Sequence, residues 1–477
     1  MLFNSLPYAL FLPIVFILYW FIVNRSMKLQ HILLLGASYF FYACWDWRFL
    51  FLLIFSTGLD YFTGLQIERS SSKRNRKIWL CISIIVNLGF LGFFKYYNFF
   101  AHSFAQVLEN FHMKPDFVTL KIILPVGISF YTFHGLSYVL DIYNNKIKAR
   151  TNWIEYSLFV SFFPLLVAGP IERATHLLPQ VEKERKFHYA QAVDGLRQIL
   201  WGLFKKIVIA DSCSGIVNQI FNNAGHYSGL TLLLGAVLFT FQIYGDFSGY
   251  SDIALGSARL FGFELLQNFN YPYFSRDIAE FWRRWHISLS SWFRDYLYIP
   301  LGGSRGTLWQ KIRNVFIIFL VSGFWHGANW TFIAWGALNA LFIMPAILFK
   351  THRNHLEIVA KGKLFPSARE AISIVLTLSL TVVAWIFFRS PSIPFAFHYI
   401  YGIFAGTGSH EHIYPYTTFL LIGIFMFIEW LGREQKYAIE HLGLQWHRPV
   451  RWLFYFGLFF IILCFSDSEQ QFIYFQF

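Results

Sequence analysis

The chain has 477 residues, of which 56% are hydrophobic, 21% aromatic and only 14% charged, whereas a soluble domain carries about a quarter charged residues. This composition excludes an ordinary soluble protein and indicates an integral membrane protein. In a soluble protein the formal net charge of +13 would suggest nucleic-acid binding as a function. Here, however, the basic residues lie in loops between apolar runs. We therefore expect no nucleic-acid partner and assign these loops to the cytoplasmic side.

Apolar runs follow one another along most of the chain and predict membrane-spanning helices, because ~20 helical residues cross ~30 Å of hydrocarbon. The runs that we assign to spans are residues 6–23, about 30–44, a third run that ends before residue 68, 78–94, 122–143, 230–261, 371–388, 417–431 and 452–465. We expect an all-α, polytopic transmembrane helix bundle with about ten to twelve spans. Basic residues after the first span and in segment 68–77 place both loops in the cytoplasm, and the N-terminus outside.

Three segments between these spans are less regular. Residues 153–167 have basic loops on both sides, which favours a re-entrant hairpin over a full crossing. Residues 190–210 carry Lys205 and Lys206 and either lie at the interface or cross. Segment 275–313 has seven basic residues against three acidic ones and belongs on the cytoplasmic side. The loop 350–369 is also basic, so the run 314–349 between them would enter and leave from one side.

The block "SRDIAEFWRRWHISLSSWFRDYLYIPLGG", residues 275–303, predicts a helix that begins at Ser275 with one aromatic face and ends before Pro300. An amphipathic helix at the membrane interface explains this pattern. The alternative is a re-entrant element that brings arginines and His286 to a cytoplasmic pocket, where a phosphorylated donor docks.

Charged side chains also occur inside a predicted span. The block "FTFQIYGDFSGYSDIALG", residues 239–256, places Asp246 and Asp252 at membrane depth, where charges face a polar interior or a partner. Their spacing of six residues does not put them on one helix face, so a catalytic pair of carboxylates is not indicated. We assign them, together with Asn329, to a structural polar interior.

The stretch "LVSGFWHGANWTF", residues 320–332, contains His326 inside a long apolar run without an obvious charged neighbour. A titratable group at membrane depth is by default a functional candidate, and a desolvated imidazole favours its neutral form, which accepts a proton. A core histidine with one hydrogen bond is the competing interpretation. Gly323 and Gly327 would let another chain or a substrate approach the ring.

Several blocks together resemble one family. The blocks "LPVGISFYTFHGLSYVLDIY", "FFPLLVAGPIER", "QIYGDFSGYSDIALG", "NFNYPYFSRDIAEFWRRWHISLSSWFRDYLYIPLGG" and "SGFWHGANWTFIAWG" are similar to the membrane-bound O-acyltransferase family, in its bacterial polysaccharide branch of alginate O-acetyltransferases. The resemblance covers residues 1–350 in order. It implies a single membrane domain, residues 1–477, with its catalytic core at about 120–350 and a funnel from each face that meets at a thin wall. His326 and His286 stand at the positions of the two family histidines.

The resemblance also implies the reaction and its participants. An acyl group moves from a cytoplasmic thioester, acetyl-coenzyme A or an acyl carrier, to a hydroxyl on the other side of a bacterial inner membrane. The final acceptor is a polysaccharide, reached through a periplasmic acetyltransferase partner, and no metal is required. The residues that we expect to bind the donor are Arg283, Arg284, Trp285 and Trp325.

Two other functions compete with this one. A transporter or flippase of lipid-linked glycans also needs a polar intramembrane cavity, but it would usually show inverted repeats or broken helices in matching positions, and the sequence shows neither. Acyl transfer to a lipid or a protein, within the same superfamily, is the second. The sequence does not identify the acceptor polymer.

Overall fold

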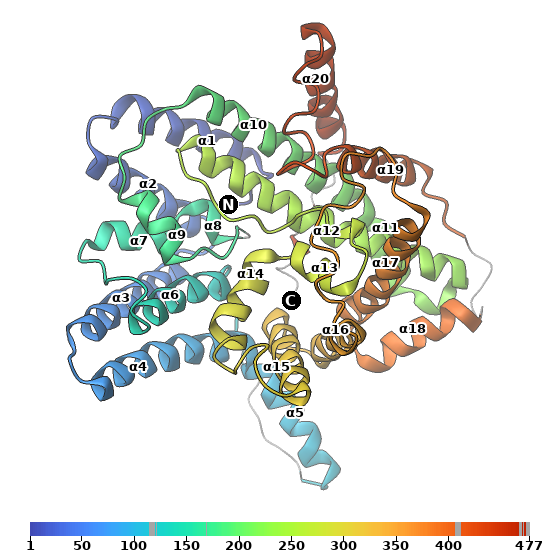
Figure 1. Ribbon diagram of the computed structural model, residues 1–477, viewed down its shortest axis with the longest axis horizontal. Helices are drawn as coiled ribbons and strands as arrows, with labels where there is room; N and C mark the ends of the chain where they lie inside the picture. The colour runs from blue at the N-terminus through green and yellow to red at the C-terminus, as the bar shows by residue number, and fades with distance from the viewer. Residues whose placement is uncertain are drawn as a thin grey trace. The chain divides into compact units, whose positions relative to one another are not determined.

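The computed structural model describes residues 1–113, 120, 122–167, 169–405, 412–466, 470 and 472–473. Every regular element in these ranges is a helix, in agreement with the all-α prediction (Figure 1). The chain divides into two compact units. We call Met1–Ala192 with Ala258–Leu266 the N-terminal unit, and Val193–Ser257 with Gln267–Phe477 the C-terminal unit. Folding as a single domain stays a prediction.

The N-terminal unit is a bundle in which α3 packs against both α4 and α6, and α2 packs against α7. Its helices, with π-helical turns written η, are α1 Leu6–Ile17, η1 Leu18–Ile22, α2 Met27–Ala43, α3 Trp47–Arg69, α4 Lys73–Leu91, η2 Gly92–Tyr96, α5 Tyr97–Asn110, α6 Ile128–Tyr143, α7 Trp153–Ser161, α8 Phe163–Leu166 and α9 Ala174–Val181. The α7 and α8 helices have nine and four residues. Each is too short to cross ~30 Å of hydrocarbon at 1.5 Å per residue, as a re-entrant segment requires.

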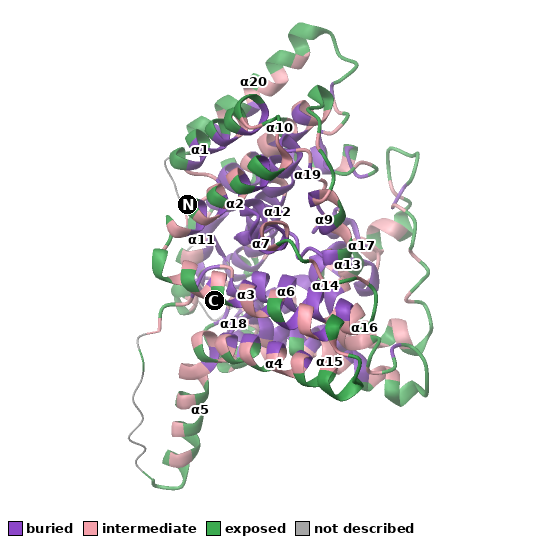
Figure 2. Ribbon diagram, turned by 90° about the vertical axis from the view of Figure 1, so that its left-hand side faces the viewer, coloured by how far each residue is buried: buried purple, intermediate pink, exposed green. Residues whose placement is uncertain are grey.

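The C-terminal unit holds the rest of the chain, apart from the first residues of α10 and the last of α12. Its elements are α10 Tyr189–Leu203, η3 Phe204–Ala210, α11 Asp211–Asn222, the 3₁₀ turn η4 Ala224–His226, α12 Gly229–Leu260, the 3₁₀ turn η5 Pro272–Phe274, α13 Ile278–Arg284, α14 Ile287–Phe293, η6 Arg294–Tyr298, α15 Leu308–His326, α16 Trp330–Leu348, α17 Ala368–Arg389, α18 Ile393–Ala405, α19 Tyr416–Leu431 and α20 Arg448–Cys464. Figure 2 shows α12 buried along most of its length, whereas α20 is largely exposed.

Five helices among the described residues are long and apolar enough to cross a membrane. They are Trp47–Arg69, Lys73–Asn110, Gly229–Leu260, Trp330–Leu348 and Ala368–Arg389, and three shorter apolar helices are Leu6–Ile22, Ile393–Ala405 and Tyr416–Leu431. The chain is therefore a multi-pass membrane protein. The finer number of ten to twelve crossings stays a prediction.

One predicted helix is wrong in its continuity. The pattern of residues 275–299 predicts one helix that begins at Ser275, but the structure breaks it into α13, α14 and η6. The first helix is capped by Asp277, whose carboxylate accepts from the backbone N–H of Glu280 at 2.7 Å. The break falls at His286, whose backbone is left-handed, with φ 43° and ψ 54°. Helical spacing of apolar residues cannot reveal such a break, because the same face continues on both sides of it.

Candidate active site

His326 is the last residue of α15, at the tip of a helical hairpin formed with α16. The α15 helix begins with a capping box between Thr307 and Gln310. The α16 helix is capped by Asn329, a half-buried residue whose side chain accepts from the N–H of Thr331 and donates to the carbonyl of Pro391. Two helices of 19 residues thus replace one apolar run. This agrees with the charge pattern, which required the run to leave from the side where it entered.

The glycines near His326 serve the hairpin. A Cβ on Gly323 would lie 2.2 Å from the carbonyl oxygen of Phe332, and a Cβ on Gly327 would lie 2.1 Å from the ring of the same residue. Both distances are far below van der Waals contact. The chain that approaches these glycines is therefore α16 itself, which brings the two helices close enough to pack.

His286 faces His326 from a separate helix break. The two ring centroids are 6.4 Å apart, too far for a direct hydrogen bond, which needs ~3 Å between heavy atoms. Trp325 lies beside both rings, at 5.9 Å from His286 and 5.0 Å from His326. We call these two imidazoles the histidine pair.

Aromatic rings enclose the histidine pair. Phe247 of α12 contacts His286 edge-on at 4.7 Å, and Trp335 and Phe388 contact His326 at 5.0 and 5.4 Å. Neither ring nitrogen of His286 has a hydrogen-bond partner among the described residues. Burial lowers the pKa of His286, which lies outside the five long spans, to about 3. Its imidazole is therefore neutral and offers one N–H donor and one acceptor nitrogen.

The remaining sequence candidates from this block are used for packing or for loop contacts. Trp285 is buried and stacks on Phe281 at 5.6 Å. Arg284 is buried and pairs with Glu280 at 2.7 Å. Arg283 donates to the backbone carbonyls of the loop 352–355 while its side chain lines a large cavity.

This cavity has a volume of about 820 Å³ and lies among α13, α14, η6, the hairpin and the loop after α16. None of the described residues that line it is acidic. We call it the basic cavity, and its lining includes the cationic side chains Arg283, Arg294, Lys311, Lys350 and Arg353. Its apolar wall includes Trp282, whose ring lies 5.6 Å from that of Trp335. Since Trp335 contacts His326, one tryptophan separates the cavity wall from the histidine pair.

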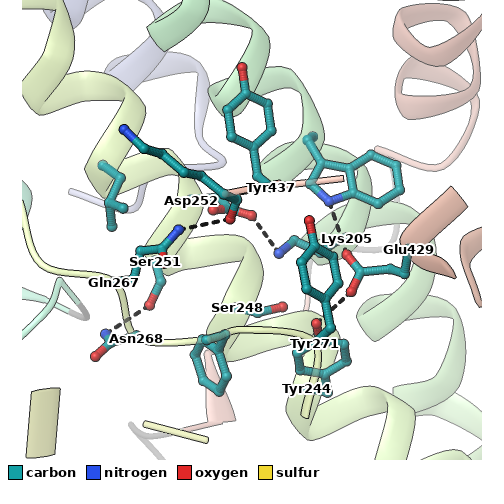
Figure 3. A pocket seen from close by; sticks show the side chains of 14 residues that line it. Lys205, Tyr244, Ser248, Ser251, Asp252, Gln267, Asn268, Tyr271, Glu429 and Tyr437 are labelled. Carbon is teal, nitrogen blue, oxygen red and sulfur yellow. Dashed lines mark hydrogen bonds and ion pairs between the residues drawn. The ribbon is translucent and has the colours of Figure 1, made fainter. Parts of the chain in front are cut away.

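A second, much smaller cavity has a volume of about 20 Å³, enough for one water molecule. Figure 3 shows how its charged side chains converge on one another. Lys205 forms an ion pair with Asp252 at 2.5 Å, and Glu429 accepts from Tyr244 at 2.6 Å and from Trp201 at 3.2 Å. We call it the ion-paired cavity. The hydroxyls of Ser248 and Tyr271, which also line it, have no hydrogen-bond partner among the described residues.

Asp246 takes part in a neighbouring pair, with Lys206 at 2.8 Å. The two intramembrane aspartates therefore bond to lysines of η3, and Asp246 also accepts from the backbone N–H of Ile473 at 2.6 Å. The signal was present in the sequence, since Lys205 and Lys206 interrupt one apolar run and two aspartates interrupt another. Their pairing joins residues more than 35 positions apart, which no local pattern reveals.

Comparison with known proteins extends these observations. A family model described as MBOAT, membrane-bound O-acyltransferase family, matches residues 143–384, about half of the chain. The chain is 39% identical to the probable alginate O-acetylase AlgI of Pseudomonas aeruginosa, over 83% of this chain and 73% of that protein. It is 34% identical to the protein of that name from Pseudomonas putida, over 98% of each. It is 32% identical to the peptidoglycan O-acetyltransferase of Helicobacter pylori, over 98% of this chain and 95% of that protein.

Proposed function

Because the chain belongs to the membrane-bound O-acyltransferase family and is an O-acyltransferase, we propose that it moves an acetyl group from a cytoplasmic thioester to a hydroxyl presented from the other side of the membrane. The final acceptor is an extracytoplasmic polysaccharide. The observation that carries this proposal is the histidine pair, two buried imidazoles from separate helix breaks 6.4 Å apart. The names of the relatives, which act on alginate and peptidoglycan, support acetyl transfer to a glycan.

In this proposal His326 is the general base. It removes the proton from the acceptor hydroxyl as the hydroxyl oxygen attacks the thioester carbonyl. The carbon–sulfur bond then breaks, and His326 returns the proton to the leaving thiolate, so no other reactant is needed. A positioned base contributes typically ~10²–10⁴-fold. His286 is neutral and donates its N–H to the developing oxyanion, where a donor in a water-poor site is most effective.

The basic cavity is the proposed donor site. It holds five cationic side chains and no described acidic one, which suits the phosphates of coenzyme A or of a carrier's pantetheine arm. Its cationic side chains all come from segments 275–313 and 350–369, the two that the positive-inside rule assigns to the cytoplasm. Arg283 contributes one wall, and Trp325 lies at the acyl end. The donor therefore reaches the histidine pair from the cytoplasmic face, with the N-terminus outside a bacterial inner membrane.

The acceptor side rests on the family resemblance. We propose that a periplasmic acetyltransferase receives the acetyl group and completes its transfer to the polysaccharide. If a reading frame for a periplasmic hydrolase-like acetyltransferase neighbours this gene, the observation favours this route. A neighbouring lipid-pathway enzyme favours acylation of a lipid.

The test is the variant His326→Ala in cells, with the O-acetyl content of the polysaccharide measured by mass spectrometry. We expect a fall of about 100-fold or more, because the base is lost. The matched control is His441→Ala, at an imidazole that is 64% exposed. Unchanged acetylation at normal expression of His326→Ala would contradict the proposal. Transfer of labelled acetyl by the purified chain would exclude a glycan flippase.

A further inference from the structure

The backbone of His286 is held in a conformation that an L-residue adopts at a cost. Its left-handed φ and ψ are unfavourable for a residue with a Cβ, because the Cβ comes too close to the following carbonyl oxygen. Such a conformation persists only where the surrounding structure fixes it. The contacts that fix this turn therefore decide where the imidazole points.

The segment 268–270 lies beside the turn and pairs with it on both sides of His286. The N–H of Ile287 donates to the carbonyl of Asn268 at 2.9 Å, and the N–H of Asn270 donates to the carbonyl of Arg284 at 3.0 Å. The guanidinium of Arg284 returns a bond to the carbonyl of Asn270 at 3.2 Å. These bonds bracket the left-handed residue.

The side chain of Asn268 extends this brace to a second helix. It is 1% exposed, and its Oδ1 accepts from the hydroxyl of Ser288 at 2.5 Å. Its Nδ2 donates to the hydroxyl of Ser251 on α12 at 3.0 Å (Figure 3). Ser251 lies one helical turn after Phe247, the ring that contacts His286 edge-on. One buried amide thus joins the turn that carries His286 to the helix against which its ring packs.

We infer that Asn268 is a positioning residue, which holds His286 toward His326 for acyl transfer. The inference rests on the proposed function of the histidine pair. Asn268 does not line the basic cavity, so it acts on turnover and not on donor binding. A shift of about 1 Å in a catalytic group costs on the order of 100-fold in rate, which sets the scale of the effect.

The experiment measures transfer from radiolabelled acetyl-coenzyme A to polysaccharide in inverted membrane vesicles. We expect Asn268→Ala to lower kcat by about 10- to 100-fold, with the KM for acetyl-coenzyme A changed by less than about 2-fold. Asn268→Asp, whose carboxylate still accepts from the hydroxyl of Ser288, should retain more activity than Asn268→Ala. Ser251→Ala, which removes the amide's acceptor on α12, loses less activity than Asn268→Ala.

A double variant separates positioning from general damage to the fold. If Asn268 acts through His286, Asn268→Ala adds less than about 2-fold to the loss in His286→Ala, because residues that act as a unit are not additive. Losses that multiply, or a raised KM with unchanged kcat, would overturn the inference. If Asn268→Ala does not fold, as judged by its thermal unfolding midpoint, Asn268→Asp and Ser288→Ala provide the same comparison.

The outcome also separates this inference from the proposed function. If His286→Ala and His326→Ala keep the wild-type rate, or wild-type vesicles transfer no label, the proposed function fails and the inference fails with it. If both histidine variants are inactive while Asn268→Ala matches wild type, only the inference is overturned.

Discussion

The basic cavity and the ion-paired cavity both contain lysine side chains, but the surroundings of these charges are opposite. In the ion-paired cavity, Lys205 lies within 2.5 Å of Asp252, with Glu429 on the same wall. In the basic cavity, five cationic side chains line the walls, and none of the described lining residues is acidic. The small cavity has room for about one water molecule, whereas the large one, at about 820 Å³, has the size of a ligand site.

The difference shows how to separate structural charges from functional ones in a membrane protein. A buried charge must be compensated, because desolvation costs several kcal/mol per ion. Where the protein supplies the counter-charge, as for Lys205, the group holds helices together. The cationic side chains of the basic cavity are mostly exposed, so solvent compensates their charge and they stay available to an anionic ligand. From the sequence we expected a structural role for Asp252 and donor binding for both arginines of α13, but the structure pairs Arg284 with Glu280.

The largest expected effect comes from breaking the ion-paired cavity. Lys205→Met leaves the buried Glu429 and the partly buried Asp252 without their cation and should lower the free energy of unfolding by about 3–5 kcal/mol. The measurement is denaturing-detergent titration of the purified chain. Lys436→Met, at the exposed rim of the same cavity, should cost less than about 1 kcal/mol. If Lys205→Met and Lys436→Met lose the same free energy of unfolding, the buried ion pair contributes no more to stability than the exposed rim charge.

The double variant Lys205→Met/Asp252→Leu sharpens this test. Replacing both partners of a buried pair by apolar groups is often neutral, so we expect it to recover most of the loss seen in Lys205→Met. A double variant as unstable as the single one would mean that the lysine contributes through packing.

The second effect concerns the basic cavity and should appear in binding. Lys311→Gln/Arg353→Gln should raise the KM for acetyl-coenzyme A by about 10-fold, equivalent to about 1.4 kcal/mol of binding free energy, with kcat little changed. Because exposed charges are screened by salt, the difference from wild type should shrink at high ionic strength. Arg305→Gln is the matched control, since this exposed arginine lies in the same loop region but does not line the cavity. An equal change in Arg305→Gln would assign the effect to surface charge in general.

These comparisons also mark how far the sequence could be interpreted. Apolar runs predicted most helices, such as α2 and α12, because burial in lipid imposes both length and composition. The charge rule predicted that the run around His326 turns back. His286 and His326 were identified from the family motif, and their convergence from two helix breaks depends on contacts far apart in the chain.

The features that escaped prediction share one physical cause. The break at His286, the brace from Asn268 and the pairing of Lys205 with Asp252 all depend on residues that are 14 to 47 positions apart. Helical periodicity reports only neighbours three or four residues away. Arg283 and Arg284 looked equivalent in sequence, but one lines the basic cavity and the other pairs with Glu280, because successive residues of a helix point in different directions.

The smallest expected effect is on the pH dependence of stability. It tests whether a buried titratable group can be accommodated without any counter-charge, by staying neutral. The pKa of His286 is lowered to about 3 by burial, against about 6.5 in the unfolded chain. Between these values the unfolded state binds more protons, so the free energy of unfolding falls as pH falls below about 6.5. From pH 7.5 to 5.5 wild type should lose about 1 kcal/mol relative to His286→Gln, measured by detergent titration at each pH. His441→Gln, at an exposed site, controls for the loss of one imidazole. If the difference in unfolding free energy between wild type and His286→Gln does not change with pH, His286 is hydrated or paired. Its charge would then be compensated, as the charges of the ion-paired cavity are.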